Sequence, residues 1–247
     1  MNELKTETQL PQTIVMPSAY ILSDQISLYG EADCVGFGND EFYIKEIPKK
    51  ISKKLIIENH YSKKVCNDAT THIHLGVFYK GQLSGCLQFG YAMNPQSMAS
   101  VVKDTKIDEY KELNRMWIKD NIIQYAESRA MSFCFKYIKR KYPKVKWIQT
   151  FADERCGGLG IVYQACSFDF YGEHSSVFWE FENEIYHNSL ITNNNRNKKA
   201  ELEKRGFNEK ATKFELRQFR YIKFINQKWK KKCLLEQKPY IKHYAVH

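Results

Sequence analysis

The feature that most constrains the fold is a helical pattern that lies between two short apolar segments. The segments 111–118 and 145–152 have the length and composition of strands, and Pro143 ends the pattern between them. A strand, a helix and a second strand in this order favour a parallel pair joined by a right-handed crossover. The sequence therefore predicts a mixed α/β layer. The apolar residues that recur at helical spacing are Ala130, Met131, Cys134, Phe135 and Ile138.

Further strands and helices surround this unit. The turn Lys80-Gly81-Gln82 joins two alternating segments and indicates a β-hairpin. The order of elements predicts an α/β (α+β) fold, a mixed central sheet flanked by helices. Strands are expected at 42–47, 71–79, 83–91, 177–182 and 214–225, and helices at 48–60, 161–168 and 198–204.

The chain can be divided by its patterning into three parts. Residues 1–40 are polar and aromatic without a clear period, so an irregular N-terminal arm is expected there. Residues 41–225 hold the patterned elements and are predicted to form one domain. Residues 226–247 are predicted to form a basic C-terminal tail.

Positive charge is concentrated at the end of the chain. The 247 residues carry a net charge of +10, while residues 195–247 hold 16 Lys or Arg against 5 Asp or Glu. The preceding residues are therefore almost neutral. A localised excess of this kind favours a polyanion partner such as nucleic acid, although a solvated basic surface would have the same composition. The residues expected to contact DNA are Lys136, Lys139, Arg140, Arg217, Arg220, Lys230, Lys231 and Lys232.

Hydropathy and cysteine usage exclude several classes of protein. No apolar run reaches the roughly 18 residues of a membrane helix, and the N-terminus has no apolar signal region. The seven cysteines are odd in number and include no Cys-x-x-Cys, which argues against a disulfide framework or a zinc knuckle. We expect a cytoplasmic protein of a reducing interior, without a membrane partner.

Glycines after the segment 145–152 allow two interpretations. The spelling Arg155-x-x-Gly158-x-Gly160 matches the loop with which acetyltransferases hold the pyrophosphate of acyl-CoA, using backbone N–H groups at a helix start. The chain after Gly160 is too short for the elements that follow this loop in those enzymes. In a second register, which fits the chain better, the helix that begins near Glu127 is the pyrophosphate-side helix and its loop has lost the glycines. Taken alone, the glycines also suit a tight turn.

Five residues are candidates for catalysis. His60 and Tyr61 follow a predicted helix; imidazole is the best general base near neutral pH, and both residue types are iron ligands. Arg115 and Asp153 lie at the ends of predicted strands, where open α/β sheets bind ligands. In the second register, Tyr163 lies where acetyltransferases often keep an acid. Each has a structural alternative: helix-end packing, a surface ion pair, a turn or a core contact.

Several blocks together resemble the phage Mom family of DNA-modification proteins. They cover about Asn59 to Gly172, and the combination is more specific than any one block. Members of that family are similar to acetyltransferases (GNAT) in fold, and they convert adenine in phage DNA to N6-carbamoylmethyladenine, which protects against restriction. The blocks are Asn59-His60-Tyr61-Ser62, Glu112-Leu113-Asn114-Arg115-Met116-Trp117, Glu127-Ser128, Phe151-Ala152-Asp153-Glu154 and Gly157-x-x-Gly160-x-x-Tyr163-Gln164-Ala165.

The resemblance implies a GNAT-like catalytic domain at 41–225 that acts on double-stranded DNA in a bacterial host cell. His60, Tyr61, Arg115, Asp153 and Tyr163 are then the expected catalytic residues. Glu127, Ser128, Gly157 and Gly160 are expected to bind the cofactor. The donor is acetyl-CoA or a glycine-like unit, because simple acetyl transfer would give an amide and not a carbamoylmethyl group. Iron held by His60, Tyr61 and Asp153 is a further hypothesis.

Two other functions stay open at this stage. An ordinary acyl-CoA-dependent N-acyltransferase acting on a tRNA, a protein or a small amine would use the same fold. A nucleic-acid-binding protein with a decayed site would keep only the basic surface. The conjunction of His60, Arg115, Asp153 and Tyr163 argues against decay.

Overall fold

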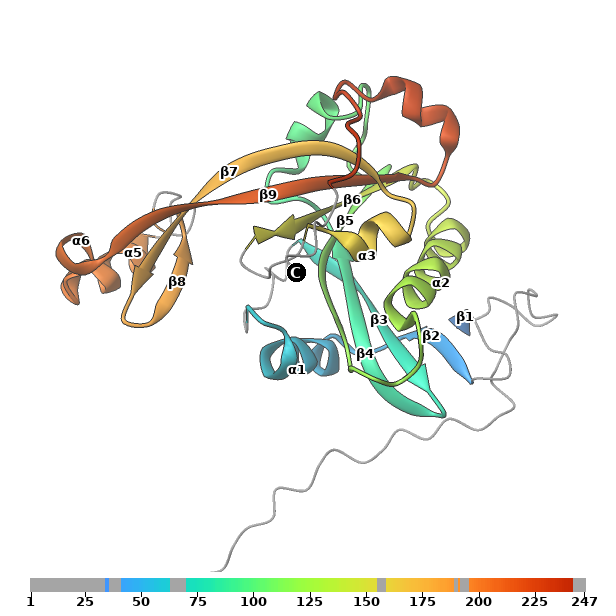
Figure 1. The fold of residues 1–247 in the computed structure, drawn as a ribbon, viewed down its shortest axis with the longest axis horizontal. Coiled ribbons are helices and arrows are strands. Elements are labelled where there is room, and N and C mark those ends of the chain that lie inside the picture. The colour runs from blue at the N-terminus through green and yellow to red at the C-terminus, as the bar shows by residue number, and fades with distance from the viewer. Residues whose placement is uncertain are drawn as a thin grey trace, which may run out of the picture. The chain divides into compact units, whose positions relative to one another are not determined.

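A computed structural model describes residues 34–35, 41–62, 70–154, 159–188, 191 and 196–241. The chain divides into two compact units (Figure 1). The first unit comprises residues 1–95 and 107–145, and the second comprises residues 96–106 and 146–247. The predicted arm at 1–40 lies outside the described residues except for a two-residue strand, and Gly157 lies outside them as well.

The first unit is an antiparallel sheet in the order β1-β2-β3-β4-β5. The predicted hairpin is confirmed: β3 and β4 pair across a turn in which Lys80 and Gly81 both have positive φ. That turn geometry matches the twist of two antiparallel strands. The elements of this unit are β1 (Cys34–Val35), β2 (Phe42–Glu46), α1 (Lys49–Asn59), β3 (Thr71–Tyr79), β4 (Gln82–Gly90), β5 (Tyr110–Ile118) and α2 (Ala126–Lys141).

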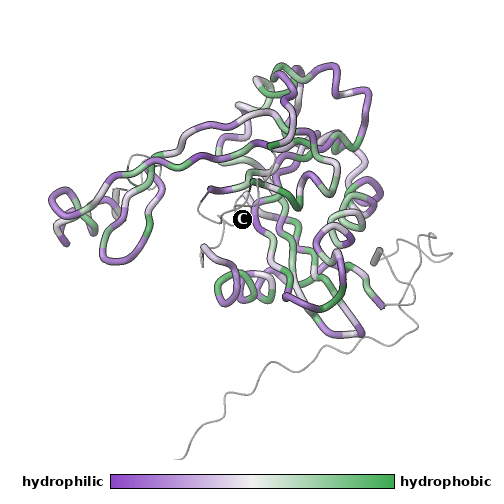
Figure 2. Tube along the Cα trace, viewed as in Figure 1, coloured by the Kyte–Doolittle hydropathy of each residue, from purple (hydrophilic) through white to green (hydrophobic). Residues whose placement is uncertain are grey.

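Two helices cover apolar surface in this unit. Helix α1 buries Ile56 in a cluster with Tyr43 and Phe78, while its charged residues face solvent. Helix α2 buries the predicted apolar face, including Met131, Cys134 and Ile138, and its last turn is basic. Figure 2 shows the hydrophobic residues gathered along β3 and β4 and alternating with hydrophilic ones along α2. The amphipathic pattern read from the sequence is thus confirmed for α2.

The second unit is an antiparallel sheet in the order β6-β9-β7-β8. Its long strands β7 and β9 pair over most of their length, and β6 pairs with β9 from Trp147↔Phe224 to Asp153↔Gln218. The elements are η2 (Pro95–Ser100), β6 (Trp147–Asp153), α3 (Ile161–Ala165), β7 (Asp169–Phe181), β8 (Glu184–His187), α5 (Arg196–Lys204), α6 (Phe207–Lys210), β9 (Thr212–Phe224) and η4 (Gln227–Lys232).

Strand β7 differs most from the sequence prediction. It begins at Asp169 rather than at Val177. Its first half joins the buried run Phe170-Tyr171-Gly172 to the exposed polar run Glu173-His174-Ser175, so it shows no apolar alternation. Gly172, with φ +90°, lies in a bulge of β7. Strand β8 was not predicted. A two-residue turn, Glu182-Asn183, joins it to β7, and both turn residues have positive φ, as the tightest hairpins require.

The C-terminal tail is part of the second unit as far as residue 241. The backbone N–H groups of Lys103, Leu234 and Lys238 bond to the carbonyl groups of Lys232, Val101 and Phe170. The basic segment is therefore held against the sheet in the residues that the structure describes. Taken together, strands and flanking helices confirm the mixed α/β class. Strands β5 and β6 are formed as predicted on either side of α2, and they belong to different units.

Candidate active site

His60 closes helix α1 and is almost completely buried, with 7% of its surface exposed. Its Nδ1 atom lies 2.8 Å from Oγ of Ser62, and its ring packs 4.2 Å from the ring of Tyr61. Tyr61 itself is 56% exposed. A buried imidazole held by a hydroxyl group, beside a solvent-facing phenol, has the parts needed to move a proton.

A buried polar network that the sequence did not reveal fixes α1 to the sheet. Oγ of Ser52 lies 3.2 Å from Nδ1 of His74 and accepts a hydrogen bond of 2.8 Å from Nε2 of Gln88. Ser52, His74 and Gln88 are all buried. Because α1 carries His60 at its end, this network also sets where His60 lies in the first unit. Nothing in the sequence indicates that a serine of a charged helix and a glutamine of a distant strand form a hydrogen bond.

Arg115 lies in the middle of strand β5 of the same sheet, and not at the end of a strand as the sequence predicted. It pairs in register with Gln88 of β4, the residue that contacts Ser52. Its Nη1 atom donates to the carbonyl oxygen of Asn114 at 2.6 Å. The first unit therefore holds His60, Tyr61 and Arg115 on elements that the buried network ties together.

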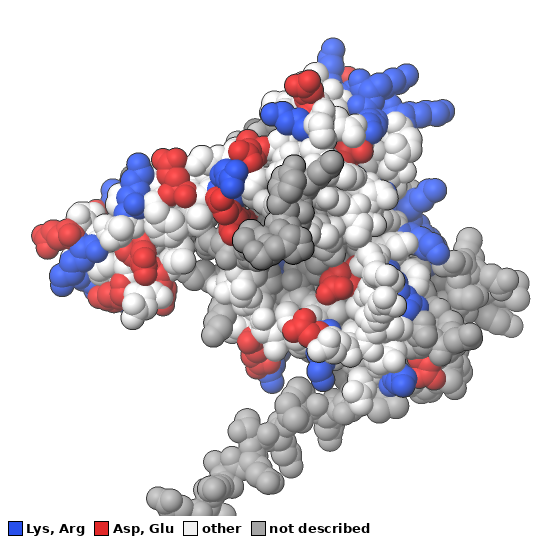
Figure 3. All heavy atoms as spheres, viewed as in Figure 1, with Lys and Arg blue, Asp and Glu red and all other residues white. Residues whose placement is uncertain are grey.

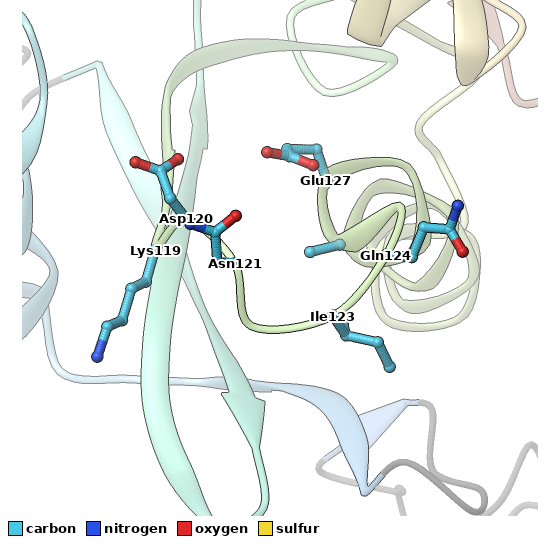
Figure 4. A pocket seen from close by; sticks show the side chains of 7 residues that line it. Lys119, Asp120, Asn121, Ile123, Gln124 and Glu127 are labelled. Carbon is cyan, nitrogen blue, oxygen red and sulfur yellow. The ribbon is translucent and has the colours of Figure 1, made fainter.

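Glu127 lines a cavity of about 620 Å³ at the start of α2 (Figure 4). The side chain of Glu127 extends toward the loop that carries Asp120, whereas the side chain of Lys119 points away from the cavity. Ser128 does not line the cavity: its hydroxyl donates to the carbonyl oxygen of Tyr125. The first turn of α2 offers N–H groups that suit a phosphate, but the two carboxylates in the lining, those of Asp120 and Glu127, oppose a dianion. The residues present do not fit an acyl-CoA pyrophosphate.

Asp153 ends strand β6 in the second unit and is 7% exposed. It pairs in register with Gln218 of β9. The next residue, Glu154, binds Arg217 through the backbone N–H and the guanidinium, at 2.8 and 2.7 Å. Arg217 also lies 3.6 Å from Glu173. Hydrogen bonds from Arg217 hold the pKa of Glu154 below its usual value. Arg217, expected to contact DNA, is thus occupied by two carboxylates.

Tyr163 and Asp153 do not share a face of the second unit's sheet. The Tyr163 ring packs 5.6 Å from that of Tyr221, whereas the neighbouring Arg220 lies over Phe151, on the face of Asp153. Successive residues of a strand point to opposite faces, so Tyr163 and Asp153 extend to opposite sides. Gly160 precedes α3 with φ +77°, directly against the Tyr221 ring. A structural requirement therefore accounts for this glycine.

The basic residues fall into two groups, one in each unit. Lys136 and Lys139 are exposed on α2, with Arg140 half-buried beside them. In the second unit, Lys230 pairs with Asp169 at 2.9 Å, and Lys232 pairs with Asp104 and lies over Trp229. Figure 3 shows Lys and Arg side chains gathered over η4, with few acidic ones among them. Both groups remain suitable for phosphate contacts, although part of their charge is paired.

No iron ligand set is supported. In the described ranges, no three His, Cys, Asp or Glu side chains gather closely enough to hold a metal ion. The described residues likewise include no helix long and apolar enough to cross a membrane.

Comparison with known proteins identifies the family. A model of the Mom protein family matches residues 41–242. The chain belongs to the Mom protein family. It is 40% identical over 225 residues to a protein named methylcarbamoylase Mom of Escherichia phage Mu, covering 90% of this chain and 92% of that protein. The match extends well beyond the blocks 59–172 that carried the resemblance.

Solved structures similar to the chain are acetyltransferases. A ribosomal L7/L12 acetyltransferase from Salmonella typhimurium is 10% identical, with a TM-score of 0.46, over 78% of this chain and 99% of that one. A microcin C7 self-immunity acetyltransferase, solved with acetyl-CoA and AMP, is 10% identical, with a TM-score of 0.43, over 81% and 98% of the two chains.

Proposed function

We propose that the chain is a transferase that converts adenine in double-stranded DNA to N6-carbamoylmethyladenine and so protects phage DNA from restriction. The observation that carries this proposal is the 40% identity to the methylcarbamoylase of phage Mu over nearly the full length of both chains. The basic residues of both units support a polyanionic substrate. Because this DNA lies inside a bacterial host, we expect the protein to act in the host cytoplasm.

The chemistry demands a base and a way to expose the target. The exocyclic amine of adenine is a weak nucleophile because its lone pair is delocalised into the ring, so N6 must lose a proton as its bond to the CH₂ carbon of the donor forms. That carbon in turn loses its bond to a leaving group of the donor, which departs with the bonding electron pair. In this proposal His60 takes that proton, and Tyr61 lies beside it at 4.2 Å between ring centroids. Arg115 and Asp153 orient the substrate. Tyr163, which the sequence predicted to be the acid, lies on the opposite face of the sheet from Asp153, so we assign it no step on the same substrate.

The adenine must also leave the duplex, because its amine is paired there. Flipping a base costs a few kcal/mol, and contacts with the DNA backbone can repay this cost. Lys136, Lys139 and Arg140 of α2 and Lys230 to Lys232 of η4 are the residues we propose for those contacts. Arg217 is a weaker candidate, because Glu154 and Glu173 already neutralise it.

For the donor we consider two chemical classes, an acyl-CoA-type thioester and a glycine-like unit. The carboxylates Asp120 and Glu127 in the 620 Å³ cavity would repel a pyrophosphate but would attract an ammonium group. The proposed mechanism therefore includes no step that uses coenzyme A. Feeding expressing cells with isotopically labelled glycine or labelled acetate, and following the label into modified adenine, separates the two classes.

The proposal is tested by restriction of DNA from cells that express the chain. We expect their DNA to resist endonucleases whose sites contain adenine, while DNA from cells with Asp153→Asn is cut normally. Equal cutting of both DNAs would contradict the proposal. An acetyl group found on a tRNA, a protein or a small amine would instead support the N-acyltransferase alternative.

A further inference from the structure

One face of the second unit carries, besides Asp153, several side chains to which the proposed mechanism gives no role. Asp153 of β6, Gln218 of β9 and His174 of β7 occupy one row across three paired strands. In the adjacent row, Phe151 pairs with Arg220. Because side chains of a strand alternate between faces, all five lie on the same side of the sheet.

Arg220, Phe151 and His174 form an aromatic and cationic group on this face. The guanidinium carbon of Arg220 lies 5.1 Å above the Phe151 ring, and the His174 ring meets the same ring edge-on at 5.4 Å. A guanidinium supported by a ring in this way is held flat, which leaves its plane suited to stacking. Flat guanidinium groups and aromatic rings are the surfaces on which proteins stack unpaired bases.

A cavity of about 270 Å³ opens beside this group. The bulge of β7, where Gly172 has φ +90°, widens the sheet edge at that point. The volume lies just below the range of about 300–1,000 Å³ for drug-sized ligands, so it suits one nucleotide at most. The lining residues are Ser100, Val101, Tyr171, Gly172, Glu173, His174, Arg220 and Leu235.

The charges of the cavity are compatible with a phosphate. Arg220 is permanently cationic. Burial and the charge of Arg220 lower the pKa of His174 below its ordinary value of 6.5, so its imidazole is neutral at pH 7 and can both donate and accept a hydrogen bond. Glu173 is the one acidic side chain in the lining, and Arg217 lies 3.6 Å from its carboxylate.

We propose that this cavity binds the flipped nucleotide of the DNA substrate, with the base stacked on Arg220 and hydrogen-bonded by His174. This inference rests on the proposed function, since it assigns the acceptor site of the same enzyme. The base would then lie on the face of the sheet that also carries Asp153. Arg220 then acts on one nucleotide and not on the DNA backbone in general.

The test measures binding of the purified full chain to a short duplex with one unpaired adenine, compared with the same duplex fully paired. Flipping costs least for an unpaired base, so the wild-type protein should prefer the first duplex. We expect Arg220→Gln to lose at least tenfold in affinity for the unpaired-adenine duplex and to lose the preference itself. His174→Ala should weaken the same preference, and this second variant keeps the charge of the surface.

Arg205→Gln is the matched control. Arg205 also stacks on a phenylalanine, at 5.5 Å from Phe181, and lies in the same unit, but it does not line the cavity. It should lose less than twofold in affinity and keep the preference. Thermal unfolding of each variant establishes that it is folded.

Equal losses for Arg220→Gln and Arg205→Gln, or an unchanged preference in Arg220→Gln, would overturn the site. Failure of the proposed function has a different signature, because binding needs no donor. If DNA stays unmodified in cells but the preference for unpaired adenine still depends on Arg220, the proposed reaction is refuted and the proposed nucleotide site is supported. If DNA is modified but Arg220→Gln binds the unpaired-adenine duplex as the wild type does, the proposed nucleotide site is refuted and the proposed reaction is supported.

Discussion

Substitution of Gly160 by alanine tests how the start of α3 is built. Gly160 has φ +77°, and a Cβ atom there would lie 2.7 Å from Cζ of Tyr221 and closer still to Cε2. The Tyr221 ring cannot yield easily, because it is fully buried. Its hydroxyl donates to the carbonyl oxygen of Leu159 and accepts from Nε2 of Gln164 at 3.0 Å. The added methyl group therefore meets a ring held on both sides.

The expected cost has two parts. The left-handed conformation costs an L-residue about 1–2 kcal/mol, and overpacking of a well-filled site costs about 1–3 kcal/mol more. Gly206→Ala carries only the first part, because Gly206 has φ +86° but its Cβ would meet nothing closer than Cε of Lys210 at 3.6 Å. Both glycines precede a short helix, so the pair isolates the packing contribution.

The assay is urea and thermal unfolding of the two variants and the wild type. A domain of this size loses roughly 2–4 °C of Tm per kcal/mol. We expect Gly160→Ala to unfold about 2–12 °C below Gly206→Ala, the span that this range gives for the packing cost of about 1–3 kcal/mol. Equal Tm values for the two variants would refute the argument that Tyr221 dictates this glycine, and would return Gly160 to its expected role in binding a cofactor.

Two further predictions concern buried polar groups of the first unit. Ser52→Ala should destabilise the chain by about 1–3 kcal/mol in urea unfolding, because His74 and Gln88 lose a buried partner; the exposed Ser175→Ala is the control, and equal losses would contradict the network. Burial lowers the pKa of Lys111 from 10.5 to about 8. Between these pH values the unfolded chain binds a proton that the folded chain does not, so the Lys111 contribution to the free energy of unfolding rises from pH 8 to 10.5. Lys111→Met should therefore stabilise the chain more at pH 7 than at pH 10, and a pH-independent effect would contradict this.

Local patterns of the sequence predicted the elements that are built locally. The turn Lys80-Gly81 and the apolar face of α2 each depend on residues close together in the chain, and both are found. Strand β7 was underestimated because its exposed half, which includes Glu173 and His174, has no apolar alternation to detect. Its length is set by pairing with β9, more than 30 residues later in the chain.

The candidate site was predictable only in part for the same reason. The family blocks pointed to His60, Arg115 and Asp153 as residues, but not to what surrounds them. The contact of Arg217 with Glu154 exists only because β6 and β9 pair, so a charge count assigned Arg217 to DNA. The buried serine of α1 likewise meets its partners through packing that no spacing in the sequence encodes.

The central claim is tested most directly by mass spectrometry of nucleosides from the DNA of cells that express this chain, beside cells that express Asp153→Asn. The account predicts a deoxyadenosine heavier by one carbamoylmethyl group in the first sample and its absence in the second. Deoxyadenosine of unchanged mass in both samples, or one heavier by an acetyl group, would contradict it.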